Sequence, residues 1–90
     1  MKRLHLIISG RVQGVFFRAY AQDCATRLEV TGWVRNTSSG DVEILAEGEE
    51  EKLKKLLDLC KRGPEPAKVD EVKITESTAT GEFRSFNIRY

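Results

Sequence analysis

The sequence predicts an α+β fold in which two helices cover one face of an antiparallel sheet. Apolar residues alternate with polar ones in several short segments, which is typical of strands with one buried face. In two longer segments the apolar residues recur every three or four positions, which is typical of amphipathic helices. Turn-forming residues separate these segments and place them in the order β-α-β-β-α-β, with a short strand added at the end.

The first strand and the first helix follow each other closely along the chain. Apolar residues alternate from Leu4 to Ile8, so we expect a strand that ends at Gly10. A helix is predicted from about residue 17 to residue 29, because apolar side chains recur there at helical spacing. These side chains are Phe17, Tyr20, Ala21, Cys24, Ala25 and Leu28. Gly32 then interrupts the helical period.

A β-hairpin is predicted after this helix. Residues 33–37 and 41–47 form two candidate strands around the turn residues Ser38, Ser39 and Gly40. The second strand alternates between an apolar set, Val42, Ile44 and Ala46, and a partly acidic set, Glu43, Leu45 and Glu47. This alternation indicates a strand with one buried face.

The second helix has clear signals at both ends. It follows Gly48, begins with three glutamates at residues 49–51 and ends near Lys61 and Arg62, so its charges suit both ends of the helix dipole. Its apolar stripe consists of Leu53, Leu56, Leu57 and Cys60, and Gly63 and Pro64 follow the helix. Beyond it we predict a strand over residues 68–76, a loop over residues 77–82 and a short terminal strand over residues 86–90.

This order of elements is that of the ferredoxin-like, or split βαβ, fold. Its first crossover is right-handed and leaves room for another strand between the first and second strands, so these two strands run in the same direction. Gly10 and Asn36 stand at their carboxyl ends. We therefore expect both residues at one edge of the sheet, with backbones roughly 10 Å apart at ~4.8 Å per strand spacing. The loop over residues 10–16 could fill that gap around a small ligand.

The composition narrows the possible classes of function. Fifteen Lys and Arg residues against 14 Asp and Glu residues give a formal net charge of +1, which provides no general attraction to nucleic acid or to an anionic membrane. No apolar run approaches the ~20 residues of a membrane span, and the apolar stretch near the N-terminus is too short for a signal peptide. We therefore expect a monomeric cytoplasmic protein with one domain over residues 1–90.

No metal site and no cofactor are predicted. Cys24 and Cys60 lack the C-x-x-C spacing of zinc sites, and His5 is the only histidine of the chain. A reducing compartment favours two free thiols, although both cysteines fall on predicted helices and a bridge between them stays an alternative. Nothing near His5 would orient it as a base, so we interpret it as an ordinary strand position.

The stretch GRVQGVFFR, from Gly10 to Arg18, is the first candidate site. A glycine-containing loop between a strand and a helix can point successive backbone N–H groups at one anion, and the helix N-terminus adds a positive dipole end. Arg18 falls in the first helical turn, where a cation is unfavourable unless an anion lies beside it. Its guanidinium can donate two parallel hydrogen bonds to phosphate oxygens. We expect at least one of Phe16 and Phe17 to lie in the core.

The glycine spacing alone is a weak signal. The stretch is not a P-loop, because the lysine and the Ser/Thr magnesium ligand are absent, and it does not match the G-x-G-x-x-G motif either. A plain structural turn is therefore the alternative interpretation. Asn36 could likewise do no more than start the turn that follows it. Near a phosphate, its amide could instead hold a water in line with the phosphorus. Arg18 and the expected convergence with Asn36 together favour an oxyanion site.

Four stretches of the chain carry further motifs: GRVQGVFFR at residues 10–18, GWVRN at residues 32–36 followed by GDVE at residues 40–43, GPEPAKVDEV at residues 63–72 and FNIRY at residues 86–90. Together these motifs resemble those of the acylphosphatase family over almost the whole chain. The resemblance implies hydrolysis of a carboxyl-phosphate anhydride to a carboxylate and inorganic phosphate, without a metal ion and without a phosphoenzyme. The family often has Asp where this chain has Ser39, a difference that bears only on a turn contact.

The resemblance also implies roles for particular residues. The family's catalytic arginine corresponds to Arg18, its water-orienting asparagine corresponds to Asn36, and its substrate is a small-molecule acyl phosphate. Its phosphate cradle corresponds to the backbone N–H groups of Gly10, Arg11, Val12, Gln13, Gly14, Val15 and Phe16. No paired carboxylates accompany these residues and no Ser-His or Cys-His pair is suggested. We therefore expect the attacking water to pass its proton to a phosphoryl oxygen of the substrate.

Two other classes of function fit the predicted fold. A ferredoxin-like sheet can bind RNA through exposed aromatic residues, but the low net charge and the lack of an RNP1-like run argue against this class. A domain that binds phosphate or carbamoyl phosphate could serve a larger enzyme, because a fold and a cradle do not prove turnover. The sequence leaves the physiological acyl phosphate open.

Overall fold

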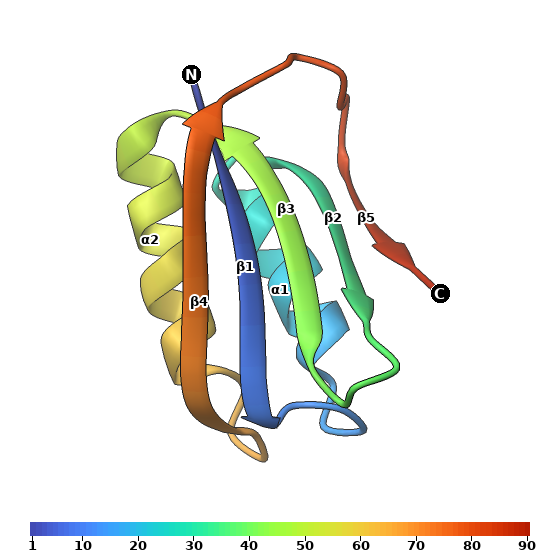
Figure 1. The fold of residues 1–90 in the computed structure, drawn as a ribbon. Helices are drawn as coiled ribbons and strands as arrows, with labels where there is room; N and C mark the ends of the chain where they lie inside the picture. Colours follow the sequence, from blue (N-terminus) through green and yellow to red (C-terminus); the bar gives the residue numbers. More distant parts are fainter.

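The computed structural model describes all residues from Met1 to Tyr90 and contains one five-stranded sheet with two helices on one face (Figure 1). The elements are β1 (Lys2–Arg11), α1 (Phe17–Arg27), β2 (Thr31–Asn36), β3 (Val42–Gly48), α2 (Glu50–Arg62), β4 (Lys68–Thr78) and β5 (Phe86–Arg89). The strands lie in the order β4-β1-β3-β2-β5. The predicted order of elements and the ferredoxin-like fold are confirmed.

The direction of the strands agrees with the prediction except at one edge. β1 and β2 both pair antiparallel with β3, which lies between them, so they run in the same direction as expected. β5, however, runs parallel to β2, so the expectation of a purely antiparallel sheet was wrong for this pair. Figure 1 shows the reason: after β4 the chain crosses the end of the sheet and returns along the free edge of β2 in the direction of β2 itself.

Several predicted boundaries also differ from the structure by one or two residues, and the ends of α1 and β4 show why. The first helix ends at Arg27 rather than near residue 29, because Glu29 adopts a left-handed backbone with φ 60°. The N–H of Val30 then donates to the carbonyl of Ala25 at 2.9 Å, which closes the helix end. β4 continues to Thr78, inside the predicted loop over residues 77–82, because Thr78 pairs with Lys2 at the start of β1.

The hydrophobic core lies between the sheet and the two helices. Phe17 is 1 % exposed whereas Phe16 is 78 % exposed, so the expectation that at least one of the two phenylalanines is in the core is confirmed. The buried helix residues belong to the predicted stripes: Phe17, Ala21 and Ala25 in α1, and Leu53, Leu56 and Cys60 in α2. Both cysteines are free thiols, and burial raises the pKa of Cys60 to about 12.

Glu47 is the only charged residue that is buried, although it lies on the face of β3 opposite the apolar residues Val42, Ile44 and Ala46. Its carboxylate accepts hydrogen bonds from Nε of Arg3 at 2.7 Å and from the backbone N–H groups of Thr80 and Gly81 at 2.9 and 3.0 Å. Burial alone would raise the pKa of Glu47, but the bonds from Thr80 and Arg3 outweigh it and lower the pKa from 4.5 to about 2. Glu47 therefore anchors the segment that leads into β5.

None of the helices combines the length and the apolar character that a membrane span requires.

Candidate functional site

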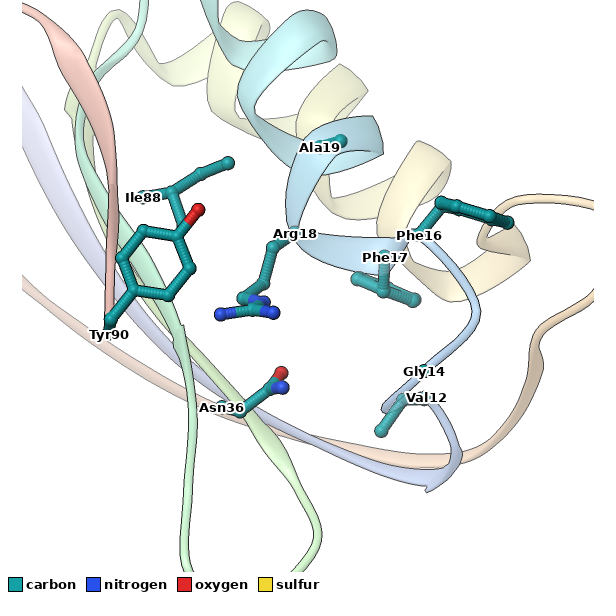
Figure 2. A pocket seen from close by; sticks show the side chains of 9 residues that line it. All are labelled: Val12, Gly14, Phe16, Phe17, Arg18, Ala19, Asn36, Ile88 and Tyr90. Atoms are coloured by element: carbon teal, nitrogen blue, oxygen red, sulfur yellow. The ribbon is translucent and has the colours of Figure 1, made fainter.

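A cleft of about 300 Å³ opens where the loop after β1 meets the end of β2. Four parts of the chain form its wall: the loop over residues 12–16, the first turn of α1, the end of β2 and the terminal strand β5 (Figure 2). The lining residues are Val12, Gly14, Phe16, Phe17, Arg18, Ala19, Asn36, Ile88 and Tyr90. Both side chains that the sequence singled out, Arg18 and Asn36, therefore line one cleft.

The loop backbone takes conformations that its sequence explains. Gly14 has φ 73°, where a residue without Cβ is favoured, and Phe16 also has a positive φ of 67°. Gly10 has φ 122° beside a bulge in the β1–β4 pairing, and a Cβ there would lie 2.2 Å from the carbonyl oxygen of Lys68. Gly10 is thus required by the close approach of β4, whereas Gly14 is required by the turn itself.

The loop holds a row of backbone donors without acceptors. None of the five N–H groups from Val12 to Phe16 donates a hydrogen bond to the backbone or to a side chain of the protein. Gly10 and Arg11 differ from these five residues, because they belong to β1 and pair with Val69 and Lys68 of β4. The unpaired donors of the predicted cradle therefore begin at Val12.

Arg18 stands in the first turn of α1, as predicted, and its guanidinium points into the cleft (Figure 2). It makes no salt bridge and no hydrogen bond within the protein. Its guanidinium carbon lies 4.9 Å from the centre of the Tyr90 ring, within cation–π range. No acidic side chain lines the cleft, so its positive charge is unopposed there.

Asn36 is the last residue of β2, and its amide points toward Arg18 in Figure 2. The side chain accepts and donates no hydrogen bond within the protein, so its amide is free for a ligand or a water. The next residue contacts the loop directly: Nε2 of Gln13 donates to the carbonyl of Thr37 at 2.8 Å. The predicted convergence of the ends of β1 and β2 is thus present in the structure.

Ile88 and Tyr90 are cleft residues to which sequence reasoning gave no role. The alternation of Phe86, Ile88 and Tyr90 predicts a strand and places all three on one of its faces. Their place at the cleft depends on β5 running parallel to β2, with Ile88 paired to Val34, and that direction carries no sequence signal. The C-terminal alternation is therefore the only hint that the sequence offers.

The groups that commonly serve as bases or metal ligands lie elsewhere. Nε2 of His5 lies 2.6 Å from Oε2 of Glu43, and Arg35 contacts the other oxygen of that carboxylate, on the face of the sheet opposite the helices. Burial would raise the pKa of Glu43, but the hydrogen bonds from His5 and Arg35 outweigh burial and lower it. No cluster of three or more His, Cys, Asp or Glu side chains is arranged to hold a metal ion.

Known proteins are similar to this chain over its whole length. The family model described as Acylphosphatase matches residues 4–88. An acylphosphatase of Marinobacter nauticus is 52% identical over 86 residues, which cover 96% of this chain and 94% of that protein. An acylphosphatase of Syntrophus aciditrophicus is 47% identical over 90 residues, which cover 100% of this chain and 94% of that protein.

A solved structure supports the same assignment. The crystal structure of acylphosphatase from Bacillus subtilis has a TM-score of 0.97 and 40% sequence identity, and each chain is covered completely. The resemblance inferred from the four motif regions is therefore confirmed by sequence and by structure. This chain belongs to the acylphosphatase family and is an enzyme that hydrolyses acyl phosphates.

Proposed function

We propose that the cleft holds the phosphoryl group of an acyl phosphate between Arg18 and the cradle predicted over residues 10–16, through the unpaired backbone N–H groups of residues 12–16, while Asn36 orients the attacking water. One observation supports this proposal most directly. The guanidinium of Arg18, which has no ionic partner, and the free amide of Asn36 line one cleft, beside the loop with five unpaired N–H groups. Backbone N–H groups at a helix N-terminus bind anions, and a guanidinium donates paired hydrogen bonds to phosphate oxygens.

The hydrolysis of an acyl phosphate requires few catalytic groups from the protein. An acyl phosphate already carries a good leaving group, because a carboxylate departs without a strong acid. The enzyme therefore needs to place a water in line with the P–O bond and to stabilise charge on the equatorial oxygens. Arg18 and the loop donors supply that stabilisation, and the Asn36 amide can accept one hydrogen bond and donate another to the water. The water's proton passes to a phosphoryl oxygen.

The remainder of the cleft offers room for the acyl part of the substrate. Beyond Arg18 and Asn36 its wall is formed by Ala19, Ile88 and the ring of Tyr90, none of which carries a charge. A cleft of about 300 Å³ is at the lower end of the sizes that hold small organic ligands. We infer that the substrate is a small acyl phosphate rather than a phosphorylated protein segment.

We further propose that residues 1–90 act as a single domain, without a metal ion or cofactor, and as a monomer. The chemistry of the donor set supports a metal-free reaction, because a guanidinium and N–H groups take the place of a cation at the phosphoryl oxygens. A cytoplasmic location fits the two free thiols, since a reducing compartment keeps cysteines unpaired. Membership of the acylphosphatase family favours catalysis over the alternatives of an RNA-binding module and an accessory phosphate-binding domain.

The proposal is tested by phosphate release from acetyl phosphate in the presence of a chelator. Arg18→Gln should lower kcat/KM by roughly 10²-fold or more, because one preorganised charge-stabilising donor is worth about 3 kcal/mol. Asn36→Ala should lower kcat more than it changes inhibition by inorganic phosphate. Arg27→Gln is the matched control, because Arg27 lies in the same helix but pairs with Asp23 on the surface.

Two results would contradict this assignment. An Arg18→Gln enzyme that keeps most of its kcat/KM, or that loses no more than Arg27→Gln, would remove Arg18 from the phosphoryl site. Loss of wild-type activity on addition of the chelator, with recovery on addition of a divalent cation, would reject the metal-free reaction.

A further inference from the structure

The side chain of Gln13 joins the loop to the end of the β2–β3 hairpin. Its Nε2 donates to two backbone carbonyls, those of Thr37 at 2.8 Å and Asp41 at 2.9 Å. Both donors of one amide group are therefore used, and both acceptors belong to a segment that is distant in the sequence. Within the loop over residues 12–16, Gln13 is the only residue whose side chain forms a hydrogen bond.

The two accepting carbonyls stand at the base of the turn that follows Asn36. The N–H of Thr37 donates to the carbonyl of Asp41 at 2.9 Å, and the N–H of Asp41 donates to Oγ1 of Thr37 at 3.1 Å. These bonds close the turn and fix both carbonyls relative to the backbone of Asn36. An amide held by both carbonyls is therefore held in a fixed position relative to Asn36.

We propose that Gln13 is a positioning residue, which sets the distance between the loop N–H groups and the amide of Asn36. This inference rests on the proposed function, in which the loop holds the phosphoryl group and Asn36 holds the water. The two halves of the site come from different elements, the loop before α1 and the end of β2. The Gln13 amide is the direct polar link between them.

Apolar packing alone would hold the loop less specifically. Val12 and Val15 anchor the loop in the core, with 1 % and 8 % of their surface exposed. Such contacts are non-directional, so they permit small rotations of the intervening backbone. Two hydrogen bonds from a planar amide fix direction as well as distance. Without them the loop still binds an anion with Arg18, but the anion shifts relative to the water on Asn36.

Gln13→Ala is therefore expected to separate the two steps of the reaction. Because a misplacement of 1 Å can cost ~10²-fold in rate, we expect kcat to fall by about 10-fold. Inhibition by inorganic phosphate should weaken by less than about 3-fold, since the loop donors and Arg18 remain. Gln13→Met keeps a side chain of similar length without the donors, and provides a second variant if the alanine variant fails to fold.

A double-mutant cycle with Asn36→Ala gives the decisive measurement. If Gln13 acts through its spacing to Asn36, Gln13→Ala should lower kcat by less than about 2-fold in the Asn36→Ala background. Gln22→Ala is the matched control, because Nε2 of Gln22 also donates to a backbone carbonyl, that of Phe86 at 3.2 Å. Its effect on kcat should be equal in both backgrounds.

The possible outcomes separate this inference from the proposed function. If Gln13→Ala lowers kcat by the same factor in the wild type and in the Asn36→Ala variant, the positioning role is wrong. It is also wrong if Gln22→Ala shows the same coupling to Asn36→Ala as Gln13→Ala does. Parallel losses in kcat and in phosphate affinity would also overturn the positioning role, because they indicate a general loss of structure. A wild-type protein without acyl phosphate hydrolysis would reject the proposed function itself.

Discussion

The guanidinium carbon of Arg18 lies 4.9 Å from the centre of the Tyr90 ring, although 98 % of Tyr90 is exposed. The ring covers one side of a charge that has no ionic partner. An unpaired arginine at a cleft mouth has many rotamers available in solvent, and stacking on a ring removes some of them. Tyr90 therefore stabilises the orientation in which the guanidinium points into the cleft.

Replacing this ring should weaken catalysis by a modest and specific amount. Tyr90→Ala is expected to lower kcat/KM for an acyl phosphate by about 2- to 5-fold, the value of an exposed cation–π contact. Tyr90→Phe keeps the ring and should retain most of the activity. Steady-state kinetics on both variants measure the difference. Equal losses in the two variants would assign the effect to the hydroxyl group instead.

The two loop glycines should respond differently to alanine. At Gly14 a Cβ meets no atom within 4 Å, so Gly14→Ala adds only the cost of a positive φ, about 1–2 kcal/mol. At Gly10 the same strain is joined by a clash with the backbone of β4, which brings the cost to about 2–5 kcal/mol. Urea unfolding measures both free energies. A larger loss at Gly14 than at Gly10 would contradict the assigned causes.

Protonation of Glu47 should lower the stability of the fold in acid. Its folded-state pKa lies below the ordinary value, so its contribution to stability is present above pH 4.5 and is lost as the pH falls toward 2. Glu47→Gln should be less stable than the wild type at pH 7 and should lose less stability across this acid range. Urea unfolding at several pH values tests this expectation. A Glu47→Gln variant with the wild-type acid dependence would assign the loss to other carboxylates.

Histidine should play no part in proton transfer. His5 pairs with Glu43 on the open face of the sheet, whereas the cleft lies on the side of the helices. His5→Gln should therefore leave the pH profile of kcat/KM unchanged. A shifted or lost ionisation in that profile would mean that the water's proton does not pass directly to the substrate.

The sequence predicts best those elements in which the local spacing of apolar residues shows which face is buried. The stripes of α1 and α2 and the alternation of β1 each identify a buried face from local spacing alone. From those elements, the split βαβ topology is enough to predict that Asn36 lies beside the loop. The roles proposed for Arg18 and Asn36 rest on the family resemblance together with this topology.

The features that the sequence does not predict depend on contacts between distant segments. β5 has four residues, and no local pattern distinguishes a parallel from an antiparallel partner. Ile88 and Tyr90 reach the cleft only because of that direction. The burial of Glu47 depends on Thr80 and Gly81, which lie more than thirty positions further along the chain. The two hydrogen bonds from Gln13 to the hairpin base likewise join segments whose proximity only the folded chain defines.

The loop before α1 also connects catalysis to stability. The residue before α1, Phe16, is held in a left-handed conformation and provides no side-chain cap, and the N–H groups of residues 12–16 have no acceptor. A bound oxyanion would supply those acceptors and so act as the missing helix cap. By linkage, a ligand at 100 times its Kd adds about 2.7 kcal/mol to the free energy of unfolding. The inorganic phosphate released in each turnover would then inhibit the enzyme and protect its fold through the same contacts.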